Sequence, residues 1–112
     1  KEVTLQMVQN FIRGGAGINV LARHVGARVV VVDMGVAEEF RIQSSGARSK
    51  KIGYGTKNMT NGPAMTREEA MKSIEAGIGL FEEEFKNGID ILGLGDMGIG
   101  NTTPSSAYLA II

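Results

Sequence analysis

The stretch from Gly93 to Pro104 (Gly-Leu-Gly-Asp-Met-Gly-Ile-Gly-Asn-Thr-Thr-Pro) most constrains what this chain can fold into. It follows a short apolar run, residues 89–92, that predicts a buried strand. Thr103 suits a helix N-cap, and Pro104 suits the first helical position, where its missing N–H costs nothing. Strand, glycine loop and helix start place free backbone N–H groups and the positive end of a helix dipole at the loop. The stretch therefore predicts an anion site, and phosphate is the first ligand to expect.

Two other interpretations of the loop stay open. Its first three glycines fit the dinucleotide pattern G-x-G-x-x-G of nicotinamide-dependent oxidoreductases, but the loop continues past the third glycine, where that pattern starts a helix. The second interpretation is a strand-to-helix turn that needs flexible residues and binds nothing. The Asn-Thr-Thr before the proline favours a ligand, because it adds amide and hydroxyl groups to the backbone N–H cluster.

Residues 95–103 also resemble the nucleotide loop of the nicotinate-nucleotide–dimethylbenzimidazole phosphoribosyltransferases. Three further stretches resemble the same family in the same order: residues 2–4 with 10–16, residues 31–36, and residues 51–58 with 62–65. The resemblance covers essentially all 112 residues, and it covers about the middle third of the family's chain. It implies transfer of phosphoribosyl from nicotinate mononucleotide to 5,6-dimethylbenzimidazole, which gives α-ribazole 5′-phosphate in cobalamin biosynthesis.

The resemblance also implies where the substrates bind. The nucleotide phosphate would contact Gly98, Ile99, Gly100, Asn101, Thr102 and Thr103. Met7 and Asn10 match family positions near the flat aromatic base. The family's catalytic base is a glutamate of its C-terminal part, which this sequence does not contain, so no catalytic residue is expected here. Asp96 stands where the family usually has a glutamate, and we expect it to support the site. No metal and no cofactor are expected.

Composition excludes several classes of function. Basic and acidic residues both number 12, so no net charge attracts nucleic acid or anionic membranes. The chain has no cysteine, and no apolar run approaches the ~20 residues of a membrane span. No signal peptide is expected from the first residues, because no apolar h-region follows them. We therefore expect a cytoplasmic protein, without nucleic-acid or membrane partners.

Apolar spacing predicts the order of elements. Helices are expected from Val3 to about Ile12 and over residues 16–24, separated by glycines. Four valines predict a strand at 29–33 that is covered on both faces. Residues 66–69 form a capping box before an amphipathic helix that ends near residue 87. With the strand at 89–93, this helix should complete a right-handed βαβ unit. The fold class is α/β, a Rossmann-like parallel sheet with flanking helices, as one partial domain over residues 1–112.

Other polar residues have two interpretations each. Asp33 lies at the carboxyl end of its strand, where it either contacts a ligand hydroxyl or caps a turn. Lys50 and Lys51 either reach a phosphate or belong to a solvated basic loop. The acidic run 82–84 is expected to be a solvated face.

A different class of function is a truncated piece that binds a phosphorylated nucleotide, or only associates with itself, without turnover. We expect the 112 residues alone to be inactive, because the family's base is missing. The last helix, starting at Pro104, is expected to run to the end of the sequence with apolar residues exposed, which predicts a homo-oligomer.

Overall fold

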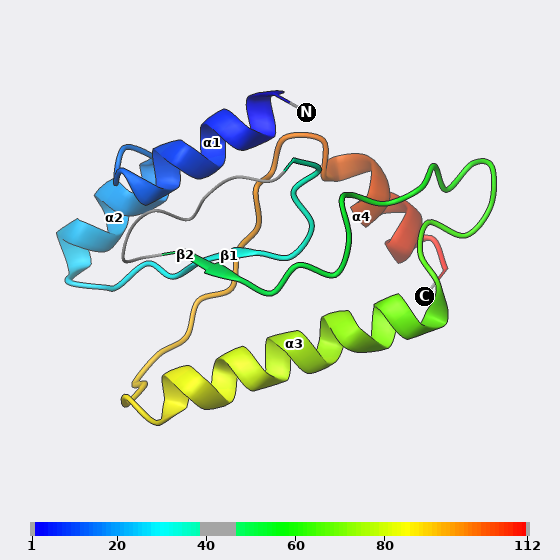
Figure 1. Cartoon of the computed structure of the whole chain (residues 1–112). Coiled ribbons are helices and arrows are strands. Elements are labelled where there is room, and N and C mark those ends of the chain that lie inside the picture. The colour runs from blue at the N-terminus through cyan, green and yellow to red at the C-terminus, as the bar shows by residue number, and fades with distance from the viewer. Residues whose placement is uncertain (1, 39–46, 112) are drawn as a thin grey trace.

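The computed structural model describes residues 2–38 and 47–111 and confirms a partial α/β fold. Its elements are α1 (Glu2–Ile12), α2 (Gly17–Val25), β1 (Val31–Asp33), β2 (Ala47–Ser49), α3 (Arg67–Phe85) and α4 (Thr102–Leu109). Helices α1 and α2 lie on one side of the two strands, and α3 lies on the other side (Figure 1). The described chain is thus a short parallel sheet with flanking helices.

The sheet pairs β1 with β2 in parallel, in the register Val31–Ala47, Val32–Arg48 and Asp33–Ser49. The valine run predicted β1, although the strand begins two residues later than expected. Strand β2 was not predicted from the sequence. Its residues, Ala-Arg-Ser, form no apolar run, so only the hydrogen bonds to β1 make this segment a strand.

The predicted strand at residues 89–93 is wrong for the described chain. This segment belongs to no strand ladder, and Ile91 is 92% exposed. A strand exists only with a hydrogen-bonded neighbour, and an apolar run by itself does not supply one. The predicted βαβ unit therefore lacks its second strand.

Helix α1 ends in a Schellman motif. Gly14 adopts φ 77°, a left-handed conformation that suits glycine. The Gly14 N–H donates to the carbonyl of Phe11 at 3.1 Å, and the Gly15 N–H donates to the carbonyl of Asn10 at 3.0 Å. These two bonds satisfy helix-end carbonyls and turn the chain toward α2. The predicted break at these glycines is confirmed.

Asn19 joins the two helices across this turn. Its carboxamide oxygen accepts the N–H of Ala16 at 3.1 Å, and its Nδ2 donates to the carbonyl of Phe11 at 3.1 Å. Asn19 is buried, so both hydrogen bonds are shielded from water. One side chain thus caps the start of α2 and the end of α1.

Helix α3 begins as its sequence predicts. The Thr66 hydroxyl accepts the N–H of Glu69 at 3.1 Å, and the Glu69 carboxylate accepts the N–H of Thr66 at 2.7 Å. This reciprocal pair is the expected capping box. Its hydrogen bonds to Thr66 hold the pKa of Glu69 below the ordinary value of 4.5.

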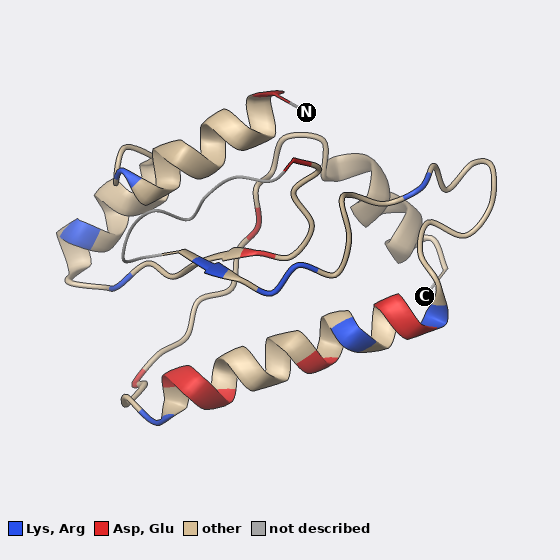
Figure 2. Cartoon of the chain, viewed as in Figure 1, with Lys and Arg blue, Asp and Glu red and all other residues tan. Residues whose placement is uncertain are grey.

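The acidic run near the end of α3 was predicted to be a solvated face, which is correct for the exposed Glu82 and Glu83 and wrong for Glu84. Glu84 is buried, and its carboxylate contacts the guanidinium groups of Arg28, at 2.5 Å, and Arg48. Glu83 contacts Arg48 and Lys50, each at 2.8 Å. Figure 2 shows the basic residues of β2 and the segment after it, and the acidic run of α3. These ion pairs attach α3 to β2.

The face of α3 turned toward the chain is made of three small residues, one leucine and Glu84. Residues at spacings of three and four are buried or half-buried: Ala70, Ser73, Ala76, Leu80 and Glu84. The apolar stripe of α3, defined as Met71, Ile74, Ile78, Phe81 and Phe85, is 45% to 62% exposed. The stripe predicted the helix correctly, but the described chain does not cover it.

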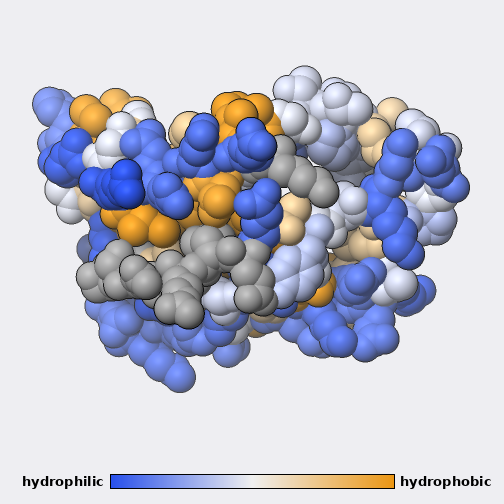
Figure 3. Space-filling model, turned by 45° about the horizontal axis from the view of Figure 1, so that its top comes forward, coloured by the Kyte–Doolittle hydropathy of each residue, from blue (hydrophilic) through white to orange (hydrophobic). Residues whose placement is uncertain are grey.

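The described chain closes only a small core. Its buried apolar residues are Val8, Ala16 and Ala22. The Cα radius of gyration is 15.0 Å, against about 13 Å for a compact domain of this length. Figure 3 shows apolar side chains open on one face beside hydrophilic ones. Much of the apolar surface that the sequence provides is therefore available to further protein.

Candidate nucleotide-binding site

The glycine loop leads into α4 through a tight turn. The N–H of Asn101 donates to the carbonyl of Gly98 at 3.1 Å, and Gly100 between them adopts φ 80°. The N-cap is Asn101 and the first helical residue is Thr102, so the predicted N-cap at Thr103 is two positions too late. Helix α4 ends at Leu109, before the end of the sequence.

Proline fits its observed place in α4. Pro104 is the third residue of the helix and not the first, as predicted; at this position too a backbone N–H has no carbonyl partner in the preceding turn. The N–H of Ser105 is the first to enter the helix ladder, and it donates to the carbonyl of Asn101 at 3.1 Å. Within the described chain, the N–H groups of Thr102 and Thr103 donate to no acceptor. Two free donors therefore lie at the positive end of α4.

The surface of the loop is open. An added Cβ would meet no atom within 4 Å at Gly93, Gly95, Gly98 or Gly100. A ligand can approach this backbone without displacing protein atoms from these positions. An oxyanion here would meet the free N–H groups and the helix dipole together, the arrangement that binds phosphate in other proteins.

Asp96 and Asn101 hold the loop together. The Nδ2 of Asn101 donates to a carboxylate oxygen of Asp96, and both residues belong to the loop. The Asn101 amide is thus engaged with Asp96, whereas the sequence placed it on the phosphate. The structure gives Asp96 a role in shaping the loop.

The residues expected near the aromatic base lie on α1. Met7 and Asn10 are one helical turn apart, so they share a face of the helix, and both are half-buried. The Asn10 carboxamide makes no hydrogen bond within the described chain. The structure places both residues on one face of α1. That they lie near the aromatic base stays a prediction.

Asp33 caps a turn, which decides between its two interpretations. Its Oδ1 accepts the N–H groups of Gly35, at 3.0 Å, and Val36, at 2.8 Å. Its Oδ2 lies 2.8 Å from the Nζ of Lys51. Asp33 is buried, and its two oxygens are used by protein groups.

Neither lysine of the pair at 50–51 is left for a phosphate. Lys51 contacts Asp33, donates to the carbonyl of Val36 at 2.6 Å and lies 4.8 Å from the ring centroid of Tyr54. Lys50 contacts Glu83. The phosphate hypothesis for these two lysines is therefore not supported. Sequence reasoning missed that each lysine has an acidic partner on another element. Lys51 pairs with Asp33 at the end of β1, and Lys50 pairs with Glu83 on α3.

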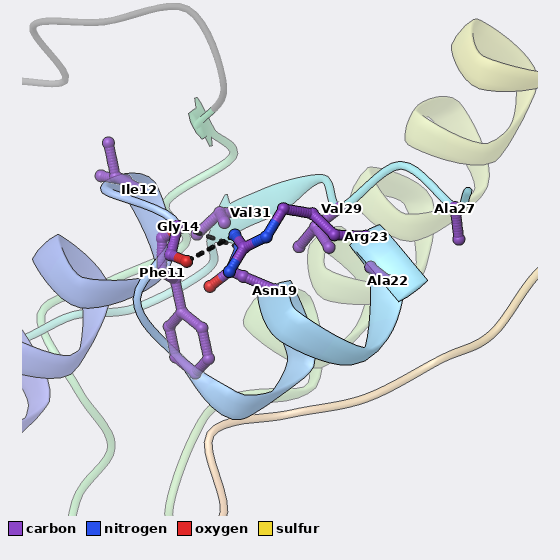
Figure 4. A pocket seen from close by; sticks show the side chains of 9 residues that line it. All are labelled: Phe11, Ile12, Gly14, Asn19, Ala22, Arg23, Ala27, Val29 and Val31. Carbon is purple, nitrogen blue, oxygen red and sulfur yellow. Dashed lines mark hydrogen bonds between the residues drawn. The ribbon is translucent and has the colours of Figure 1, made fainter. Parts of the chain in front are cut away.

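Two hollows of the described chain were not predicted from the sequence. A cavity of about 230 Å³ lies between α1, α2 and β1, and Phe11, Asn19, Arg23 and Val31 are among its lining residues (Figure 4). Arg23 donates to the carbonyl of Gly14 at 2.7 Å beside it, as Figure 4 shows. This cavity contains none of the predicted site residues.

The second hollow adjoins the glycine loop. It is lined by Asn101, Pro104, Ser105, Tyr108 and Leu109. These residues are three and four apart, so they share one face of α4, and this spacing could have been recognised in the sequence. It offers apolar surface directly beside the free N–H groups of the loop.

The described chain shows no cluster of three or more His, Asp or Glu side chains that could hold a metal ion. In the same residues, no helix is long and apolar enough to cross a membrane.

Comparison with known proteins identifies the family. The family model described as "Phosphoribosyltransferase" matches residues 1–112, the whole chain. This chain belongs to that family. A nicotinate-nucleotide–dimethylbenzimidazole phosphoribosyltransferase of Geobacter sulfurreducens is 58% identical over 110 residues, which are 98% of this chain and 31% of the relative. A protein of the same name from Dehalococcoides mccartyi strain CBDB1 is 56% identical over all of this chain and 32% of the relative.

A solved structure of the family has the same fold. The crystal structure of CobT from Thermus thermophilus matches with a TM-score of 0.92 at 44% identity, over 98% of this chain and 33% of that one. The family member described here therefore spans about a third of the length of the relatives it matches.

Proposed function

We propose that this chain supplies the nucleotide-binding part of a phosphoribosyltransferase that uses nicotinate mononucleotide and 5,6-dimethylbenzimidazole. The observation that carries the proposal is the open glycine loop with the unpaired N–H groups of Thr102 and Thr103. The names of the matching relatives supply the two substrates. The phosphate of the mononucleotide would bind over residues 98–103, at the start of α4.

The chemistry of the transfer sets what the site needs. The pyridinium nitrogen of nicotinate mononucleotide is already cationic, so nicotinate leaves without being protonated. The attacking imidazole nitrogen must lose a proton, which requires one general base. Attack on the face opposite the leaving group gives the α product.

In this proposal Asp96 is not the general base that deprotonates the imidazole. Its carboxylate accepts a hydrogen bond from Asn101 and belongs to the loop on the phosphate side. The base would therefore come from a part of the family's chain beyond these 112 residues. We expect the chain alone to bind the nucleotide without turnover.

Two titrations test the proposal. Nicotinate mononucleotide is added to the isotope-labelled chain, and the amide signals of Thr102 and Thr103 should shift on binding. Nicotinate riboside, which lacks the phosphate, should bind much more weakly. Equal affinity of the two ligands, or signals that stay unchanged, would contradict a phosphate site at this loop. Nicotinate release with both substrates at saturation should stay at the uncatalysed rate.

We further propose that the chain associates with itself through the apolar stripe of α3. The stripe is 45% to 62% exposed, and contiguous apolar surface of this kind favours association. Molar mass in solution should therefore exceed that of a monomer. Ile78→Glu places a charge within the stripe and should lower the molar mass in solution. Gly77→Glu adds the same charge one position away, where an added Cβ meets no atom within 4 Å, and should change it less.

The cytoplasmic location expected from the composition stays a prediction.

A further inference from the structure

We propose that Gly15 is a positioning residue for Asn10. The absence of a side chain at Gly15 leaves the space that the Asn10 carboxamide occupies, and this placement sets the affinity for the aromatic base. The inference rests on the proposed function, which includes binding of 5,6-dimethylbenzimidazole, and on the family resemblance, which implies that Met7 and Asn10 lie near this base.

The turn after α1 brings the two residues together. The Gly15 N–H donates to the carbonyl of Asn10, so the backbone of residue 15 lies over the last turn of the helix. A Cβ on Gly15 would approach the Oδ1 of Asn10 to less than 3.0 Å and its Cγ to 3.4 Å. The backbone carbonyl of Asn10 would be 3.8 Å away, an ordinary contact. A methyl group here therefore displaces the carboxamide and leaves the turn in place.

The backbone of Gly15 does not itself require glycine. Gly14 adopts a positive φ in this turn, whereas Gly15 does not. Alanine at Gly15 is therefore free of backbone strain, and its effect is confined to the neighbouring side chain. The requirement for glycine comes from Asn10 and not from the turn.

The Asn10 carboxamide is available to a ligand. It is half-buried, it lies on the same face of α1 as Met7, and it makes no hydrogen bond within the described chain. A carboxamide presents two donors and one acceptor oxygen. Those groups can pair with the ring N–H and ring nitrogen of a benzimidazole, and Met7 offers apolar surface to its flat ring. A carboxamide that is turned away loses this pairing.

The chain contains a matched control two residues further on. A Cβ on Gly17 would meet no atom within 4 Å, and Gly17 does not adopt a positive φ. Gly15→Ala and Gly17→Ala thus make the same chemical change, one in the connection and one at the first residue of α2, and only the first touches Asn10.

Four variants test the proposal: Gly15→Ala, Gly17→Ala, Asn10→Ala and the double variant of Gly15→Ala with Asn10→Ala. The first measurement is the side-chain amide signal of Asn10 in the isotope-labelled protein. It should shift in Gly15→Ala and stay in place in Gly17→Ala. The second is the affinity for 5,6-dimethylbenzimidazole, with nicotinate mononucleotide titrated separately.

Gly15→Ala should weaken binding of the base by roughly three- to tenfold, as expected for one lost hydrogen bond. Asn10→Ala should weaken it by the same factor, and the double variant should equal Asn10→Ala. Affinity for nicotinate mononucleotide and the melting temperature should not fall in Gly15→Ala. This pattern shows that Gly15 acts only through Asn10.

An unchanged Asn10 signal in Gly15→Ala would overturn the positioning role. A double variant that binds more weakly than Asn10→Ala would also overturn it, since Gly15 would then act by another route. If the Asn10 signal moves and the base binds no variant, including the unsubstituted chain, the base pocket fails and the inference fails with it. The mononucleotide titration then reports separately on the glycine loop.

Discussion

The side-chain amide of Asn101 donates a hydrogen bond to the carboxylate of Asp96 across the glycine loop. The two residues bracket the turn that carries Gly98 and Gly100. The bond ties the N-cap of α4 to the start of the loop. The shape of the proposed anion site thus depends on a carboxylate that need not touch the ligand.

Substitution of Asp96 should separate this positioning role from a direct one. Asp96→Glu keeps a carboxylate on a longer arm, so nucleotide affinity should be retained or increase. Asp96→Ala removes the acceptor of the Asn101 amide and should weaken binding by roughly three- to tenfold, as expected for the loss of one exposed hydrogen bond that supports the loop. Calorimetric titration of nicotinate mononucleotide measures both, and exposed Asp90→Ala is the control. Equal losses in the two Asp96 variants would show that its carboxylate does not support the loop through Asn101.

A branched side chain at Gly100 should abolish nucleotide binding. Gly100 adopts φ 80°, a conformation that costs a β-branched residue roughly 1–3 kcal/mol. Gly100→Val would also place methyl groups where the phosphate approaches. Gly93→Val is the matched control, because Gly93 has the same open surroundings and no positive φ. Helix content by circular dichroism should be similar in both variants. Unchanged affinity in Gly100→Val would mean that the loop is only structural.

Loss of the Glu84 charge should destabilise the protein. Glu84 is buried between Arg28 and Arg48, so Glu84→Gln removes the compensating charge from both guanidinium groups. Both arginines are partly exposed and can be solvated again by water. The expected loss in the free energy of unfolding is therefore about 1–3 kcal/mol. Urea unfolding measures it. The neighbouring exposed Glu82→Gln should change the free energy of unfolding by less than about 0.5 kcal/mol. Equal effects of the two variants would contradict the role of Glu84.

The first turn of α3 should lose helical structure at low pH. Hydrogen bonds from Thr66 lower the pKa of Glu69 below 4.5, its ordinary value in an unfolded chain. A lowered folded-state pKa contributes stability that is complete above pH 4.5 and is lost as the pH falls through the folded-state value. Helix content measured from about pH 6 to about pH 2 should therefore decrease below pH 4.5. In Glu69→Gln the decrease in helix content below pH 4.5 should be smaller, because the variant has no carboxylate to protonate at this position. An identical acid profile in the variant would show that Glu69 does not contribute to the decrease.

Local patterns in the sequence predicted the helices well. The capping residues Thr66 and Glu69 and the glycines after α1 and α2 specify helix ends through contacts only a few residues apart. The glycine loop and its following helix were also predicted. The N-cap was placed wrongly, because Thr103 and Asn101 are both good N-cap residues and only the turn at Gly98 selects between them.

Features that depend on distant contacts were not predicted. β2 is a strand only because β1 lies beside it, and residues 89–93 lack such a neighbour in the described chain. The buried position of Glu84 follows from two arginines on other segments. No window of sequence around Glu84 contains that information.

The hydrogen bonds that join α1 to α2 have a consequence for the order of folding. Those that Asn19 and Arg23 donate to Phe11 and Gly14 span eight and nine residues, whereas those that Lys50 and Arg48 donate to Glu83 span 33 and 35. Closing short loops costs less chain entropy, so local contacts form sooner. We expect α1 and α2 to assemble as a unit before α3 attaches, which pulsed hydrogen exchange would detect as early protection of the Ala16 amide. Such a unit, emerging before the strands during synthesis, would give them a preformed surface on which to pair.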